Sequence, residues 1–103
     1  MKKVIAQLLP EEFAKVFDIR MHEGYVTPFS TREAAGAMRN GTSVVKTRVD
    51  PGGDITSVGQ RGKVMGSIRA PGVPDLGIMY FIAWDHEPTY VISCHESKLA
   101  ASQ

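Results

Sequence analysis

The sequence predicts a mainly β fold with N-terminal helices, and three features of the 103-residue chain lead to this class. Residues 77–84 are almost entirely apolar and rich in β-branched and aromatic side chains, which at this length is typical of a buried strand. From Thr42 onward the pattern takes on the period of two that strands show, whereas residues 1–41 carry helix signals. We therefore expect an N-terminal helical arm (residues 1–41) and a β-domain (residues 42–103) that fold as one cooperative unit.

The arm is expected to contain two short helices. The first begins at Pro10, because proline lacks an amide donor that the first helical turn does not use, and the carboxylates of Glu11 and Glu12 suit the positive end of a helix. An apolar stripe carries this helix to about Asp18. The members of the stripe are Leu9, Phe13, Val16 and Phe17.

The second helix is expected from Ser30 to Met38. Ser30, with Glu33 three residues later, forms a capping-box pattern in which each side chain satisfies a backbone amide at the helix start. Asn40 and Gly41 then supply a left-handed stop. We expect the arm to pack on the β-domain.

Four strands and one helical turn are expected next, in the segments 43–49, 62–69, 78–84, 89–94 and 95–98, before a last apolar anchor at Leu99. In the third strand, alternation places Tyr80 and Trp84 on one face and Met79 and Phe81 on the other. Because neither face is polar, we expect the first pair in the core and the second pair against the arm. Gly66 predicts a sharp bend or a close approach of two backbones.

The connections are marked by glycine, proline and acidic residues. Residues 50–54 predict a turn, and Ile55 and Val58 are the residues that could anchor the loop after it. Residues 70–75 read as a loop stiffened by proline, and residues 85–88 as the tight turn of the last hairpin.

Glycines and apolar residues recur in a recognisable order in the second half of the chain. The order is Gly62-Lys63-Val64-Met65-Gly66, Tyr80-Phe81-Ile82-Ala83-Trp84, Tyr90-Val91-Ile92 and Ser97-Lys98-Leu99. Residues 43–99 thereby resemble a small Src-homology-3-like β-barrel of about five strands, a layout shared by several accessory and ribosomal proteins. The resemblance implies that residues 42–103 form a small barrel, and it bears on function only by analogy.

The reactive side chains do not form a catalytic or metal-binding pattern. The residues considered are His22, His86, His95 and Cys94. The histidines lack the short spacings of metal ligands, and the side chains of the adjacent Cys94 and His95 would point to opposite faces of a strand. Cys94 is expected to share the inward face with Tyr90 and Ile92, where a thiol is inert. We expect no enzyme activity, no metal and no cofactor.

Charge is unevenly distributed, although the net charge is only +1. Residues 46–69 have a local excess of three positive charges, and residues 75–96 carry four acidic side chains without a lysine or arginine. A dipolar surface orients docking to a protein partner or to a second copy of the chain. The expected partner-binding residues are Lys46, Arg48, Lys63 and Arg69.

Two functions fit these observations. The first is a non-catalytic protein-interaction module or accessory subunit that docks onto a larger protein assembly. The alternative is a small barrel that binds RNA or DNA, with the basic residues on phosphates and aromatic side chains stacked on bases. Residues 42–76 contain no aromatic residue, which counts against the alternative. The single cysteine and the absence of a long apolar run favour a cytoplasmic protein without a membrane span.

Overall fold

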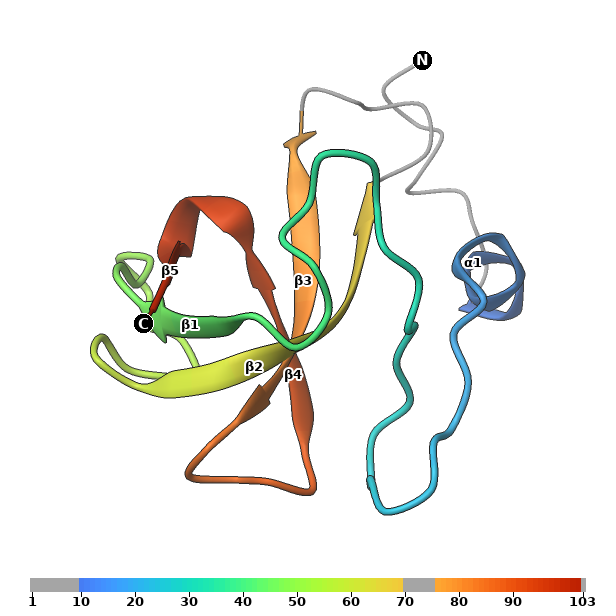
Figure 1. Cartoon of the computed structure of the whole chain (residues 1–103), viewed down its shortest axis with the longest axis horizontal. Coiled ribbons are helices and arrows are strands. Elements are labelled where there is room, and N and C mark those ends of the chain that lie inside the picture. Colours follow the sequence, from blue (N-terminus) through green and yellow to red (C-terminus); the bar gives the residue numbers. More distant parts are fainter. Residues whose placement is uncertain (1–9, 70–75, 103) are drawn as a thin grey trace.

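The protein is a mainly β domain with a five-stranded antiparallel sheet and one short α-helix among the described residues (Figure 1). The computed structural model describes residues 10–69 and 76–102. Its elements are α1 (Pro10–Phe17), β1 (Ser43–Lys46), β2 (Arg61–Arg69), β3 (Ile78–Trp84), β4 (Val91–His95), the 3₁₀ turn η2 (Glu96–Lys98) and β5 (Leu99–Ala101). The expected loop at 70–75 lies outside the described residues, as does Leu9.

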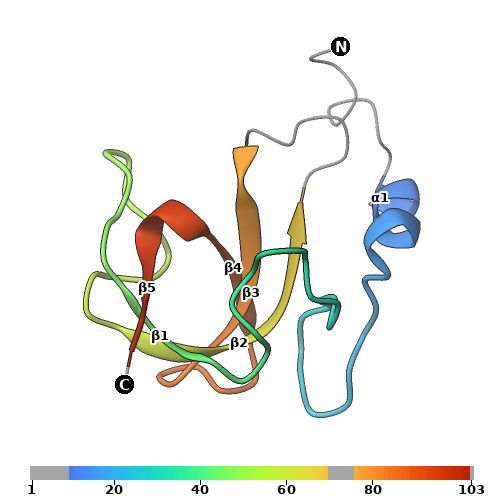
Figure 2. The same cartoon turned by 45° about the horizontal axis from the view of Figure 1, so that its top comes forward.

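The strand order in the sheet is β4-β3-β2-β1-β5, so β4 and β5 are its two edges. Figures 1 and 2 show β2 turning from the direction of β1 to that of β3. A register shift between Val64 and Gly66 marks the turning point, as a β-bulge does. A Cβ atom built on Gly66 would lie 1.7 Å from the carbonyl oxygen of Ser30, so the expected close approach of backbones is confirmed.

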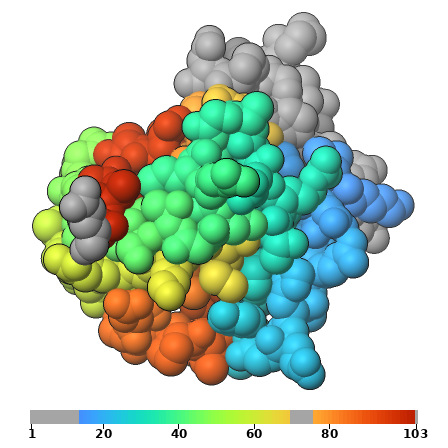
Figure 3. Space-filling model, in the orientation of Figure 1, coloured from blue at the N-terminus to red at the C-terminus, as the bar shows by residue number. Residues whose placement is uncertain are grey.

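The sheet has an apolar core on each of its faces. One core consists of Val44, Val64, Ile78, Tyr80, Ile82, Trp84 and Cys94. The other consists of Phe17, Phe29, Ile68, Phe81 and Val91, with Ile19, Tyr25, Met65, Met79 and Ala83 packed against it. The expected division of β3 is confirmed in that Tyr80 and Trp84 lie in the first core, whereas Phe81 shares the second core with Phe17 and Phe29 of the arm and Met79 packs against it. The arm also reaches the first core, since the amide of Met38 donates to the hydroxyl of Tyr80 (2.8 Å). In Figure 3 the arm, blue to teal, lies directly against the strands.

The expected helix at residues 30–38 is wrong. This segment is irregular, and its capping side chains bond elsewhere: Glu33 accepts a hydrogen bond from the amide of Asn40 (2.7 Å) instead of closing a capping box. Ser67 on β2 competes for the backbone, because its hydroxyl accepts from the amide of Ala34 (2.9 Å) and its amide donates to the carbonyl of Arg32 (2.8 Å). The segment is thus bound along β2, where these tertiary hydrogen bonds replace helical ones.

Several boundaries also differ from expectation. β1 ends at Lys46 rather than residue 49, and β5 is a strand where only an anchor was expected. Tyr90 precedes β4 and is 46% exposed, so it does not face inward. Ile55 and Val58 do not anchor their loop, because they are 80% and 58% exposed. Helix α1, strands β2 and β3 and the 3₁₀ turn fall within about one residue of the expected segments, whereas β4 runs from Val91 to His95 rather than over residues 89–94.

Candidate functional site

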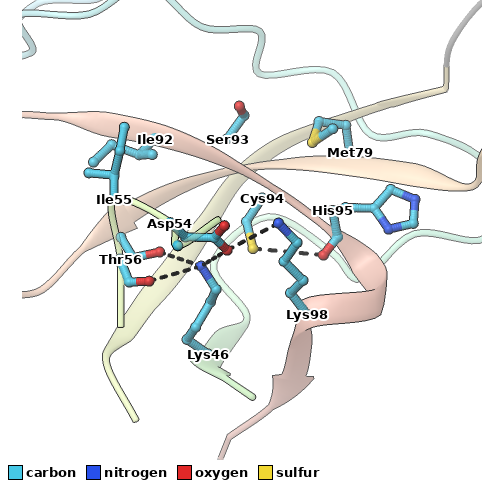
Figure 4. Close-up of a pocket in the computed structure, with 11 residues that line it drawn as sticks. Lys46, Asp54, Ile55, Thr56, Met79, Ile92, Ser93, Cys94, His95 and Lys98 are labelled. Carbon is cyan, nitrogen blue, oxygen red and sulfur yellow. Dashed lines mark hydrogen bonds and ion pairs between the residues drawn. The ribbon is translucent and has the colours of Figure 1, made fainter. Parts of the chain in front are cut away.

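A hollow of about 340 Å³ lies between the β1–β2 loop (residues 47–60), β4 and the 3₁₀ turn η2 (Figure 4). It is the largest of the hollows described here. The residues that line it are Lys46, Gly53, Asp54, Ile55, Thr56, Met79, Ile92, Ser93, Cys94, His95 and Lys98.

The floor of the hollow contains a buried lysine. Lys46 alternates with Val44 on β1, which directs its side chain into the domain, and only 3% of the residue is exposed. Its Nζ donates to the hydroxyl (2.6 Å) and the carbonyl (3.2 Å) of Thr56 and lies 2.9 Å from Oδ2 of Asp54. The same ammonium lies 5.9 Å from the ring centre of Trp84, within reach of a cation–π attraction. This lysine therefore has its donors occupied within the protein.

A second lysine completes the ion network. Nζ of Lys98 lies 2.7 Å from Oδ2 of Asp50 and 3.0 Å from Oδ2 of Asp54. Hydrogen bonds from Lys46 and Lys98 lower the pKa of Asp54 to about 2, and hydrogen bonds to Asp50 and Asp54 raise the pKa of Lys98. The expected turn at residues 50–54 is present, with the Gly53 amide donating to the Asp50 carbonyl (2.8 Å). The network ties this turn to β1 and to η2.

The rim of the hollow is apolar on the side of the loop. Ile55 lies between Asp54 and Thr56, the two residues that bind Lys46. Its backbone is therefore fixed, while its side chain is left 80% exposed. Ile92 and Met79 are partly buried and line the same hollow. Ile55 therefore presents exposed apolar surface on a backbone that is held in place on both sides.

Cys94 and His95 also line the hollow. Cys94 is buried, and desolvation raises the pKa of its thiol. Nδ1 of His95 accepts from the amide of Ser97 (3.1 Å) and caps η2, while its Nε2 contacts the carbonyl of Leu76. Across residues 10–69 and 76–102 there is no group of three or more His, Cys, Asp or Glu side chains that could hold a metal ion.

The structure does not bring the four expected partner-binding residues together. Lys46 is buried, which corrects the expectation that it contributes to a basic surface. Arg48 donates to Ser97 Oγ (3.0 Å), beside η2, and Lys63 is paired with Ser43 of β1. Arg69 donates to the carbonyl of Ala35 (3.0 Å for Nη2). Lys63 and Arg69 are six residue steps apart on β2, which corresponds to at most about 20 Å along an extended strand.

Arg69 instead lines a second hollow, of about 240 Å³, at the junction of β2 and the arm. Arg32 and Val16 also line it, and Arg32 donates to the carbonyl of Val16 (3.3 Å). Both guanidinium groups therefore bind backbone carbonyls of the arm in this structure.

Sequence reasoning named Lys46, Cys94 and His95 separately but did not indicate that they line one hollow with Asp54 and Lys98. The sequence pattern places Asp50 and Asp54 in a turn, but one lysine partner, Lys98, follows them by 48 and 44 residues. The other partner, Lys46, lies on a strand whose inward face the pattern does not assign. The available signal was the shared face of Val44 and Lys46, since a lysine beside a buried valine in a strand needs a carboxylate partner.

Within the described part of the chain, no helix is long and apolar enough to cross a membrane. Comparison with protein-family models, with curated proteins and with solved structures found no match for this chain.

Proposed function

We propose that the protein is a non-catalytic interaction module that binds a segment of a protein partner in the hollow beside β4. The observation that carries this proposal is Ile55, an isoleucine that is 80% exposed although its flanking residues are bound to a buried lysine. Full burial of such a side chain releases about 1.5–3 kcal/mol, which favours a complex in which the partner covers it. A loop already held in place loses little further entropy on binding.

The finer fold is part of the same proposal: the β-domain is a Src-homology-3-like barrel. Its support is the sheet order, in which the first strand lies between the second and the last, and the single 3₁₀ turn between β4 and β5. The bend of β2 at Gly66 supports it further, because a small barrel needs its long strand to belong to both halves of the sheet.

The nucleic-acid alternative has less support. Among the described residues, the only large aromatic side chain with a high exposure is Tyr90. The basic residues are distributed over different parts of the surface, and Lys46 is buried. Binding to single strands ordinarily needs stacking aromatics beside a basic groove.

A selection from a displayed random-peptide library on the immobilised protein tests the proposal. We expect the selection to enrich peptides. Their affinity for Ile55→Asp should be lower by about tenfold or more, because the substitution removes apolar contact area. Val58→Asp is the matched control, since Val58 is 58% exposed on the same loop but does not line the hollow. A library that yields no binder, or binders that tolerate Ile55→Asp, would overturn the proposal.

A charge reversal tests the expected basic residues in the same assay. The double variant Arg48→Glu, Arg69→Glu should keep the peptide affinity within about threefold, because neither side chain lines the hollow beside β4 and exposed charges contribute about 0–1 kcal/mol. If this variant loses peptide binding while Ile55→Asp keeps it, the docking surface is the basic one. If the protein retains oligonucleotides with a steep dependence on salt, the nucleic-acid alternative is correct.

A further inference from the structure

We propose that the partner segment binds as an added β-strand on the edge of β4, with its backbone paired to Ser93. This inference rests on the proposed function and specifies how the hollow beside β4 is used. The occupant is an extended peptide that places an apolar, uncharged side chain against Ile55.

The backbone groups of Ser93 point away from the sheet. β4 is an edge strand, and in an antiparallel pair only alternate residues bond to the neighbouring strand. The amide and carbonyl of Val91 both bond to Thr27 Oγ1 (2.8 and 3.2 Å) rather than to β3. At the other end, the amide of Ile78 on β3 donates to the Glu96 side chain (2.7 Å), so it faces the β4 side of the sheet. This agrees with the same alternation of inward-bonding and outward-facing residues along β4. Ser93, two residues from Val91, therefore presents an amide and a carbonyl outward.

Those two groups of Ser93 have no further partner among the described residues, whereas their neighbours toward the turn do. The arm already lies along this edge: the amide of Val26 donates to the carbonyl of Thr89 (2.8 Å), and Thr27 bonds to Val91. These contacts lie beside Thr89 and Val91, and Thr27 makes its contact through a side chain, so residues 26–27 add no strand to β4. The outward amide and carbonyl of Ser93 are therefore left for the backbone of another segment, as unpaired groups on an edge strand are.

The hollow continues from this open edge. Figure 4 shows Ser93 and Cys94 on opposite sides of β4, so the hollow includes the edge of the strand as well as its inner face. A strand added here would direct alternate side chains toward Ile55 and Ile92 on one side. The lysines of the floor bond to Asp50 and Asp54, so the chemistry that fits is apolar rather than charged.

The peptide recovered by the library selection is the probe that tests the binding mode. A set of copies, each with one N-methylated amide, should show a period of two: methylation at alternate positions weakens binding by about fivefold or more, because one inter-strand hydrogen bond is lost, and methylation between them does not. A uniform tolerance of methylation would overturn the strand mode while leaving docking at Ile55 intact. Failure to recover any peptide would instead overturn the proposed function.

The protein side is tested with Ser93→Pro, which removes the outward amide at an edge position where proline is tolerated. Ser93→Ala is the matched control, because it removes the hydroxyl but keeps the amide. We expect Ser93→Pro to lose about fivefold or more in affinity and Ser93→Ala to bind like the parent protein. Equal affinity of a folded Ser93→Pro and the parent protein overturns the proposal. If Ser93→Pro does not fold, slowed hydrogen exchange of the Ser93 amide on adding the peptide decides the question in the parent protein, and unchanged exchange overturns the inference.

Sedimentation of the free protein tests a different occupant. A dimer that Ser93→Pro dissociates and Ser93→Ala does not would place a second copy of the chain on this edge and overturn the proposal of a partner peptide.

Discussion

Lys46 and Asp54 determine where the β1–β2 loop lies. A lysine that is 3% exposed costs free energy unless its charge is paired and its donors are bonded, and here Asp54 and Thr56 provide both. Because those two partners flank Ile55, the same interactions that satisfy a buried charge also fix the position of an exposed apolar side chain.

The acid sensitivity of the loop follows from Asp54. Its folded pKa is lowered from 3.8 to about 2 by Lys46 and Lys98, so its contribution to stability is fully present above about pH 4 and is lost as the pH falls toward 2. The difference in stability between the parent protein and Asp54→Asn should therefore shrink between pH 4 and pH 2. Urea unfolding at a series of pH values measures it, and a difference that stays constant down to pH 2 would contradict the assignment.

Cys94 should react slowly with a thiol reagent at neutral pH. Burial raises its pKa, so the reactive thiolate is scarce and the sulfur is shielded. Stoichiometric labelling should appear only after denaturant is added, with the denatured chain as the reference rate. Fast labelling of the native protein would show that the hollow admits the reagent to a thiolate.

At the scale of elements, β2 and the arm meet at a contact that only glycine allows. A Cβ at position 66 would lie 1.7 Å from the backbone oxygen of Ser30, and neither backbone can yield without breaking the bonds that Ser67 makes to the arm. The bulge at this position and the path of residues 30–38 therefore depend on each other.

Gly66→Ala should destabilise the protein by about 1–3 kcal/mol or more, through overpacking against the arm. Gly52→Ala is the control, because a Cβ there meets nothing within 4 Å and no positive φ is required. Denaturant unfolding measures both. Equal stability of the two variants would mean that the arm moves aside from β2 without loss of free energy.

At the scale of the whole molecule, the arm completes the second core. Phe17 and Phe29 are buried against Phe81, Ile68 and Val91 of the sheet. Removing residues 1–41 should expose this apolar face and cause aggregation or loss of cooperative unfolding. Light scattering and a thermal melt test the prediction, and a soluble truncated domain with a sharp transition would refute it.

A pair of point variants tests the same contact without truncation. Phe29→Ala should cost about 3–5 kcal/mol, because the ring is almost fully buried. Val26→Ala, at an exposed position in the same arm, should change stability by less than about 0.5 kcal/mol.

The sequence by itself determined the elements whose signal is local. Strand β3 was predictable because its seven consecutive apolar residues, between a glycine and an acidic turn, have the length and the β-branched and aromatic content of a strand covered on both faces. Helix α1 followed from Pro10 and the acidic residues after it, and the helical turn expected at residues 95–98 is the 3₁₀ turn η2. Gly66 predicted a close approach of two backbones, although the sequence did not identify Ser30 as the other residue.

Only the tertiary structure decided the features that depend on distant residues. The capping pattern at Ser30 did not produce a helix, because the hydroxyl and amide of Ser67 bind the backbone of that segment. Lysine is usually a surface residue, but Lys46 is buried because the carboxylate of Asp54 pairs with it. Asp54 lies on a loop whose path no local sequence pattern specifies. The hollow beside β4 exists for the same reason: its charges, its exposed isoleucine and its open strand edge meet only when the chain is folded.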